Sequence, residues 1–171
     1  KFKRVFPTMA GIIGVIAVTV VTLLCNFDRA QTWLPIFGFL GGAIVGLIDD
    51  GINVFGSGEG AAGLRAPIKF AMITVVSLVL GWFFAYKLGW TSIHIPFAGD
   101  IEIGGVVMVG LFTFAVVATS NAVNISDGLD GLAGGLAMMA YGAFGTIALF
   151  RGQVYLFAFC MTVVGWLFSY V

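Results

Sequence analysis

The chain has 171 residues, of which 60% are hydrophobic and only 9% are charged. Its mean hydropathy of +1.10 is far above that of a protein that covers its core with a polar surface, which excludes a soluble domain. Eight basic residues balance eight acidic ones, so no positive field would attract nucleic acid. The composition predicts an integral membrane protein with no nucleic-acid partner.

Six apolar segments approach the roughly 20 mostly apolar residues that one membrane crossing requires. The second is rich in glycine, which lets helices pack closely in lipid. We therefore expect an all-α, polytopic helical bundle that forms one integral-membrane domain over residues 1–171. Because the chain starts at Lys1 and the last apolar run has no closing signal, truncation at both ends is expected. The predicted spans are 8–26, 33–48, 68–86, 104–120, 132–150 and 154–171.

The connection between the third and fourth spans contains the alternating sequence IHIPFAGDIEIGG. This pattern predicts a short β-hairpin outside the bilayer. We interpret its histidine, His94, as a surface or packing residue, because it stands close to Pro96 at a predicted interface. Cys25 and Cys160 both lie in apolar runs and are predicted to pack as small hydrophobic side chains rather than to form a disulfide or a metal site.

The spans alternate in direction, so the N-terminal segment, the second connection and the fourth connection lie on one side of the membrane. That side carries five basic residues against three on the other, which predicts that it faces the cytoplasm and that the hairpin is extracytoplasmic. Acidic residues hardly influence orientation, so the acidic residues gathered on the same side need another explanation. The basic residues are Lys1, Lys3, Arg4, Arg65 and Lys69 against Arg29, Lys87 and Arg151.

Asp49 and Asp50 close the second predicted span in the sequence GLIDDG. One interpretation is a helix end at the water boundary, with Gly51 terminating the helix. Carboxylates at a helix C-terminus oppose the macrodipole, however, so this interpretation predicts Lys or Arg instead. Adjacent carboxylates are suited to binding a divalent cation or to taking a proton from an acidic nucleophile, and we favour such a function.

Residues 120–135 read SNAVNISDGLDGLAGG. Asn121, Asn124, Asp127 and Asp130 recur every third residue, so a helical conformation would place them on one face. Their oxygen atoms could bind a hydrated Mg²⁺ ion or the hydroxyl and imide groups of a nucleotide. A turn rich in Asn, Asp, Ser and Gly explains each residue singly, but it does not explain the regular spacing.

Arg65 and Lys69 follow a glycine-rich stretch that lacks the spacing of a Walker loop. We interpret Arg65 as a residue that snorkels to the membrane interface. Lys69 lies one turn inside the third predicted span, near the expected depth of the aspartates. It fits two interpretations equally, an interface anchor and a ligand of a phosphate group. Four aspartates with basic neighbours indicate magnesium-dependent chemistry on a phosphate whose other end is lipid.

The motifs NAVNISDGLDGLAGG, GLIDD and PTMAG resemble those of the polyprenyl-phosphate sugar-1-phosphate transferases, along essentially the whole chain. The PTM segment is most similar to the branch that uses a muramoyl-pentapeptide. The resemblance implies transfer of phospho-MurNAc-pentapeptide from UDP-MurNAc-pentapeptide to undecaprenyl phosphate, which gives lipid I and UMP in peptidoglycan synthesis. It also implies Mg²⁺ as cofactor, a multi-pass location in the bacterial plasma membrane with a cytoplasmic active site, and a homodimer.

The same resemblance assigns roles to single residues. It makes Asp49 and Asp50 catalytic, with Asp49 deprotonating the lipid phosphate. It implies that a principal metal ligand and a histidine-rich loop lie beyond Val171, while Asn53 and Ala62 depart from the lysines of the family pattern. The metal-binding positions are Asp49, Asp50 and Asp127, and the substrate-binding positions are Thr8, Lys69, Asn121, Asn124, Asp127 and Asp130.

Three alternatives stay open. One is a GlcNAc-1-phosphate type of transferase that makes a different lipid-linked sugar. Another is a small cation or proton-coupled transporter, in which intramembrane acids form the ion path. The third is a catalytically inactive scaffold, suggested by Asn53 and Ala62. Transport predicts acids near the middle of the spans, whereas the four key aspartates lie at predicted span ends, which favours chemistry on a substrate that arrives from the cytoplasm.

Overall fold

The computed structural model describes residues 10–26, 29–55, 65–97, 99–126, 128 and 131–170. Within these residues the chain forms six α-helices, one π-helical turn (η1) and a two-stranded antiparallel hairpin. The predicted all-α bundle with one short hairpin is therefore confirmed. The elements are α1 (Ala10–Cys25), α2 (Arg29–Phe55), α3 (Ala66–Trp82), η1 (Phe83–Lys87), β1 (Ser92–Ile95), β2 (Gly99–Glu102), α4 (Gly105–Ser126), α5 (Leu132–Phe150) and α6 (Val154–Tyr170).

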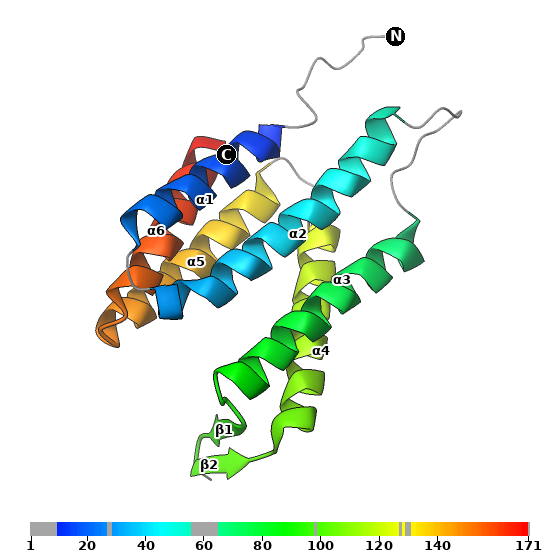
Figure 1. The fold of residues 1–171 in the computed structure, drawn as a ribbon. Coiled ribbons are helices and arrows are strands. Elements are labelled where there is room, and N and C mark those ends of the chain that lie inside the picture. The colour runs from blue at the N-terminus through cyan, green and yellow to red at the C-terminus, as the bar shows by residue number, and fades with distance from the viewer. Residues whose placement is uncertain are drawn as a thin grey trace.

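Helix α2 lies between two groups of helices (Figure 1). Helices α1, α5 and α6 pack together on one side, and α3 packs against α4 on the other. The hydrophobic core lies where α1, α2 and α6 meet, and α2 also packs against α3. Helix α2 therefore joins the two groups. The buried residues of this core are Val18, Ile36, Phe159, Cys160, Val163 and Leu167.

Glycine makes room for close helix contacts, as the sequence predicted. A Cβ atom added at Gly41 of α2 would lie only 2.7 Å from a methyl carbon of Val76 on α3. One added at Gly145 of α5 would lie 3.1 Å from the Cβ atom of Cys160 on α6. Both cysteines are free thiols, and Cys160 is buried in the core while Cys25 is exposed. The predicted packing role is thus confirmed for Cys160.

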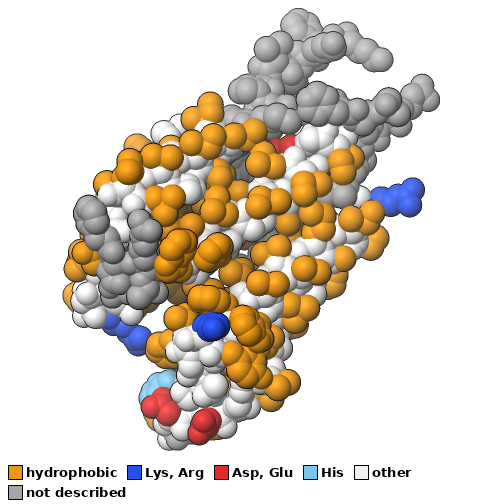
Figure 2. Space-filling model, viewed as in Figure 1, with side chains coloured by type: hydrophobic (Ala, Val, Ile, Leu, Met, Phe, Trp, Pro, Cys, Tyr) orange, Lys and Arg blue, Asp and Glu red, His pale blue; other side chains and the backbone are white. Residues whose placement is uncertain are grey.

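The outer surface of the bundle is apolar over most of its length. On the face shown in Figure 2, hydrophobic side chains cover the helices, and the charged side chains lie near the ends. Among the described residues, α2, α4, α5 and the continuous α3–η1 segment are long and apolar enough to cross a membrane, whereas α1 and α6 are apolar but shorter. Such a surface is stable in lipid but not in water, so the chain is a multi-pass membrane protein.

Helices α2 and α4 extend beyond the ends that the sequence predicted. Helix α2 continues through Asp49, Asp50 and Gly51 as far as Phe55, and α4 continues to Ser126. The predicted span ends at residues 48 and 120 are therefore seven and six residues short of the helix ends. A glycine in a helix interior costs only about 1 kcal/mol relative to alanine, which is too little for Gly51 to end a helix that packs on its neighbours.

The predicted hairpin is confirmed at the far end of α3. The backbone N–H of Leu88 donates to the carbonyl of Phe83 at 3.2 Å, which closes the π-helical turn, and Gly89 then turns the chain with a φ of 70°. Strands β1 and β2 pair with His94 opposite Asp100. His94 is exposed, as predicted, and its Nδ1 lies 2.8 Å from an Asp100 carboxylate oxygen.

Candidate functional site

The site is built around Lys69, in the first turn of α3. Pro67 stands at the start of this helix, where its missing N–H costs nothing because the first N–H groups of a helix have no partner within the helix. The carbonyl of Arg65 accepts hydrogen bonds from the N–H groups of Ile68 and Lys69 at 2.9 and 3.1 Å. The helix start therefore fixes the backbone from which the Lys69 side chain extends.

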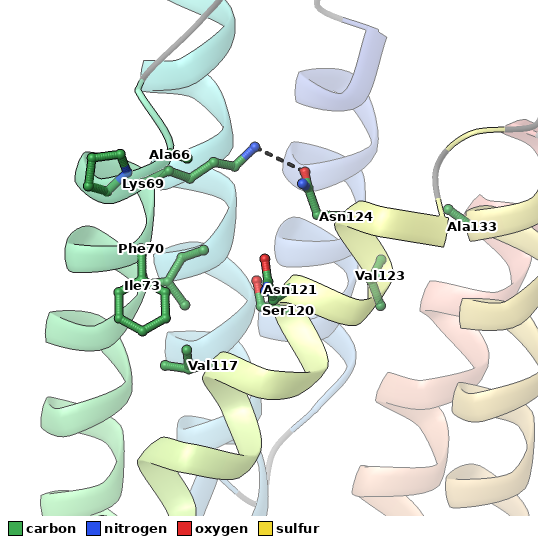
Figure 3. A pocket seen from close by; sticks show the side chains of 11 residues that line it. Ala66, Lys69, Phe70, Ile73, Val117, Ser120, Asn121, Val123, Asn124 and Ala133 are labelled. Atoms are coloured by element: carbon green, nitrogen blue, oxygen red, sulfur yellow. Dashed lines mark hydrogen bonds between the residues drawn. The ribbon is translucent and has the colours of Figure 1, made fainter.

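The Lys69 ammonium joins three helices. Its Nζ lies 3.0 Å from an Asp49 carboxylate oxygen on α2 and 3.2 Å from the Asn124 amide oxygen on α4 (Figure 3). The partners stand 20 and 55 residues away in the sequence. The side chains of Lys69 and Asp49 are 30% and 23% exposed, so water screens the ion pair only in part.

A cavity of about 560 Å³ opens beside this junction, between α3, α4 and the start of α5. One part of its wall is polar, and another part is apolar (Figure 3). Such a lining suits a ligand that combines an anionic or hydrogen-bonding group with an apolar or aromatic one. The polar residues are Lys69, Ser120, Asn121 and Asn124, and the apolar ones are Ala66, Pro67, Phe70, Ile73, Val117, Val123 and Ala133.

A second, more apolar cavity of about 490 Å³ lies between α2, α3 and α4. It shares Lys69, Ile73 and Ser120 with the first cavity. Gly42 and Gly46 of α2 form part of its wall, and a Cβ atom added at either would meet no other atom. Lys69 therefore stands where a polar cavity and an apolar cavity meet.

The structure brings together several of the residues that the sequence singled out. Asp49 and Asn124 contact Lys69, and Asn121 lines the same cavity one helical turn from Asn124. Asp50 follows Asp49 on α2 and is partly buried. Both asparagines are helical, as the three-residue spacing required. The remaining predicted site residues, Thr8, Asp127 and Asp130, lie outside the described residues.

The sequence analysis missed Ser120 and the apolar wall. Helical spacing carried the signal for both. Ser120 and Asn121 follow Val117 by three and four residues, and Asn124 follows them by four and three, which places the four residues on one face of α4. Ile73 follows Lys69 by four residues on α3 in the same way. Extending these periods from the predicted polar residues into the spans would have identified the wall.

Oxygen atoms of the kind that Mg²⁺ prefers lie at this junction. Mg²⁺ binds hard oxygen ligands, commonly one or two carboxylates together with water and substrate phosphates. The Asp49 carboxylate and the Asn124 amide oxygen are such ligands, and both contact the Lys69 ammonium. Among the described residues no three His, Cys, Asp or Glu side chains cluster closely enough to hold a metal alone.

Comparison with known proteins gives consistent results. A phospho-N-acetylmuramoyl-pentapeptide-transferase of Lactobacillus helveticus is 36% identical over 168 residues, covering 96% of this chain and 51% of that protein. A protein of the same name from Levilactobacillus brevis is 34% identical over 171 residues, with 96% and 52% covered. Another from Chloroflexus aggregans is 36% identical over 167 residues, with 93% and 45% covered. The chain thus spans about half the length of these relatives.

Residues 32–171 match the family described as glycosyl transferase family 4. The matched range includes Asp49, Lys69 and Asn124, and therefore the whole junction at which the three helices meet. The chain belongs to glycosyl transferase family 4.

Proposed function

We propose that this chain forms part of a phospho-N-acetylmuramoyl-pentapeptide transferase of the bacterial plasma membrane. The reaction moves phospho-MurNAc-pentapeptide from UDP-MurNAc-pentapeptide to undecaprenyl phosphate, giving lipid I and UMP for peptidoglycan synthesis. The observation that carries the proposal is the Lys69 ammonium, held between Asp49 and Asn124 where a polar and an apolar cavity meet. The names of the relatives support the choice of substrates.

Lys69 binds a phosphate group of the substrate. A lysine ammonium has three N–H donors, and among the described residues two of them reach Asp49 and Asn124. The third is available to an oxygen atom in the cavity. Hydrogen bonds between an ammonium and a phosphate are short and roughly twice as strong as neutral ones, so one donor is enough to position the phosphate.

The apolar cavity accommodates the first part of the polyprenyl chain. It begins at Lys69 and continues along α2, α3 and α4, so a lipid phosphate bound to Lys69 would have its hydrocarbon on the apolar side. The more polar cavity then receives the UDP-sugar. Asn121 and Asn124 offer amide groups to the nucleoside, and we assign Asp130 and Thr8 to the same substrate.

The transfer needs one proton acceptor and a shielded leaving group. Asp49 takes the proton of the lipid phosphate, whose oxygen then bonds to the β-phosphorus as the bond from that phosphorus to the UMP oxygen breaks. The electron pair of the broken bond leaves with UMP. Asp49, Asp50 and Asp127 would hold Mg²⁺, which when bound neutralises charge on the pyrophosphate. Lys69 screens the remaining phosphate charge.

Radiolabel transfer from UDP-MurNAc-pentapeptide to undecaprenyl phosphate tests the proposal. The protein, produced from its complete gene, is assayed in membranes with the Lactobacillus helveticus relative as a positive control. Asp49→Asn removes the proton acceptor, so we expect the rate to fall by about 10²-fold or more. Asp100→Asn alters a carboxylate on the distant hairpin, and we expect it to leave the rate unchanged.

The same assay separates the alternatives. If UDP-GlcNAc served as the donor and UDP-MurNAc-pentapeptide did not, the protein would be a GlcNAc-1-phosphate type of transferase. Near-normal turnover of Asp49→Asn would contradict the role of Asp49. Full activity in the presence of a chelator would contradict the requirement for magnesium.

A further inference from the structure

The β-hairpin separates polar and apolar side chains onto opposite faces. Residues directly opposite each other in an antiparallel pair project from the same side of the sheet. The pairs Ser92 with Glu102 and His94 with Asp100 therefore form a polar face, and the 2.8 Å contact between His94 and Asp100 lies on it. The alternating pairs, Ile93 with Ile101 and Ile95 with Gly99, form an apolar face. The hairpin is fully amphipathic.

The apolar face is partly exposed in the described part of the chain, and its Ile93 is partly buried. Ile95 is 44% exposed and Ile101 is 41% exposed. Phe97, in the turn between the strands, is completely exposed. Its φ of 74° lies in the left-handed region, where a bulky side chain is strained and glycine is preferred. The turn thus holds an aromatic ring away from the protein at a conformational cost.

The surroundings of the hairpin place it at the membrane surface. Trp82, Tyr86 and Trp90 lie at the end of the α3–η1 segment, and each is about half exposed. Tryptophan and tyrosine gather at membrane–water interfaces, so these residues mark the level of the lipid headgroups. Strand β1 begins two residues after Trp90, and a strand of four residues is only about 13 Å long. The hairpin therefore stays near the headgroup layer.

We propose that the hairpin lies on the lipid bilayer, with its isoleucine face against the headgroup and acyl boundary and the Phe97 ring inserted there. An amphipathic element at this level buries its apolar face in lipid and leaves its polar face in water. His94, Asp100 and Glu102 then face the aqueous side. The contact anchors the connection between α3 and α4, at the end of the bundle opposite Lys69.

Site-specific fluorescent labelling tests the lipid contact without reference to activity. An environment-sensitive fluorophore is attached to Phe97→Cys or to its polar-face counterpart His94→Cys, each in a Cys25→Ala background with the buried Cys160 retained. The proteins are reconstituted into vesicles of phosphatidylethanolamine and phosphatidylglycerol. Iodide serves as the aqueous quencher, and a lipid with a nitroxide near its headgroup serves as the membrane quencher. The unsubstituted Cys25→Ala protein gives the labelling blank.

We expect the label at position 97 to be quenched by the nitroxide lipid and to be several-fold less sensitive to iodide than the label at position 94. Ile95→Cys retains Phe97 and should behave like position 97. Equal iodide sensitivity at positions 94, 95 and 97 would show that the hairpin stands in water. Protection of positions 95 and 97 from both quenchers would show that protein covers the apolar face. Either result overturns the proposal.

Discussion

Lys69 could not be assigned from its sequence position alone, because a lysine one turn inside a span serves equally well as an interface anchor. The structure adds the contacts of the side chain, and they are the basis on which we propose phosphate binding. The ammonium contacts Asp49 and Asn124 and lines two cavities, whereas a snorkelling lysine extends into the headgroup layer. The sequence placed all three residues on one side of the membrane through the alternation of spans. It could not show that they touch, because contacts across 20 and 55 residues depend on how helices pack.

Breaking the Lys69–Asp49 pair should reveal coupling between the two residues. We expect the double-mutant cycle of Lys69→Met and Asp49→Asn to give a coupling free energy of about 1 kcal/mol, as is typical of a partly hydrated ion pair. Thermal unfolding in detergent measures it. Lys87→Met, on the opposite side of the membrane, is the control and should show no coupling to Asp49→Asn. Additive effects of Lys69→Met and Asp49→Asn would contradict an ion pair in solution.

At the scale of elements, the apolar pattern predicted the six helices that the structure describes, and the alternating pattern predicted the hairpin. The predicted ends of α2 and α4 were wrong for one reason. Gly51 and the Asn- and Ser-containing sequence after residue 120 resemble turn signals, but intrinsic preferences are small compared with helix packing. Asp49, Asp50, Asn121 and Asn124, which lie beyond the predicted span ends, are therefore helical. This difference determines which residues share a face at the site.

The distinction between a helical glycine and a turning glycine can be measured. Gly51 lies inside α2, where an added Cβ meets nothing, so Gly51→Ala should stabilise the protein by about 0.5–1 kcal/mol. Gly131 caps α5 with a φ of 82°, so Gly131→Ala should destabilise it by about 1–2 kcal/mol. Unfolding of both variants in detergent gives the comparison. Destabilisation by Gly51→Ala would place the end of α2 at Gly51 after all.

At the scale of the whole molecule, alternating spans place the Lys69 junction and the hairpin at opposite ends of the bundle (Figure 1). The excess of basic residues on the junction side predicts that this end faces the cytoplasm. A nucleotide-linked substrate made in the cytoplasm could then reach the cavity directly. The proposed function and the proposed orientation thus support each other.

Cysteine accessibility tests this orientation. Ala66 and Ser92 are exposed residues at opposite ends of α3 and its following segment, and replacing either with cysteine leaves every basic residue in place. In a Cys25→Ala background, we expect an impermeant maleimide to label Ser92→Cys in intact spheroplasts. Ala66→Cys should react only after the membrane is permeabilised. The reverse pattern would place the junction outside the cytoplasm.

Helix α2 also links the site to the thickness of the bilayer. Thr32 and Asp49 stand 17 residues apart on one continuous helix, which corresponds to about 26 Å, close to the roughly 30 Å of a bilayer's hydrocarbon. Asp49 therefore lies on a helix that spans this distance, rather than on a loop. A thicker bilayer would draw the carboxylate toward hydrocarbon, and a thinner one would leave it in water. The acyl-chain length of the surrounding lipids thus determines how much water surrounds Asp49 and its partner Lys69.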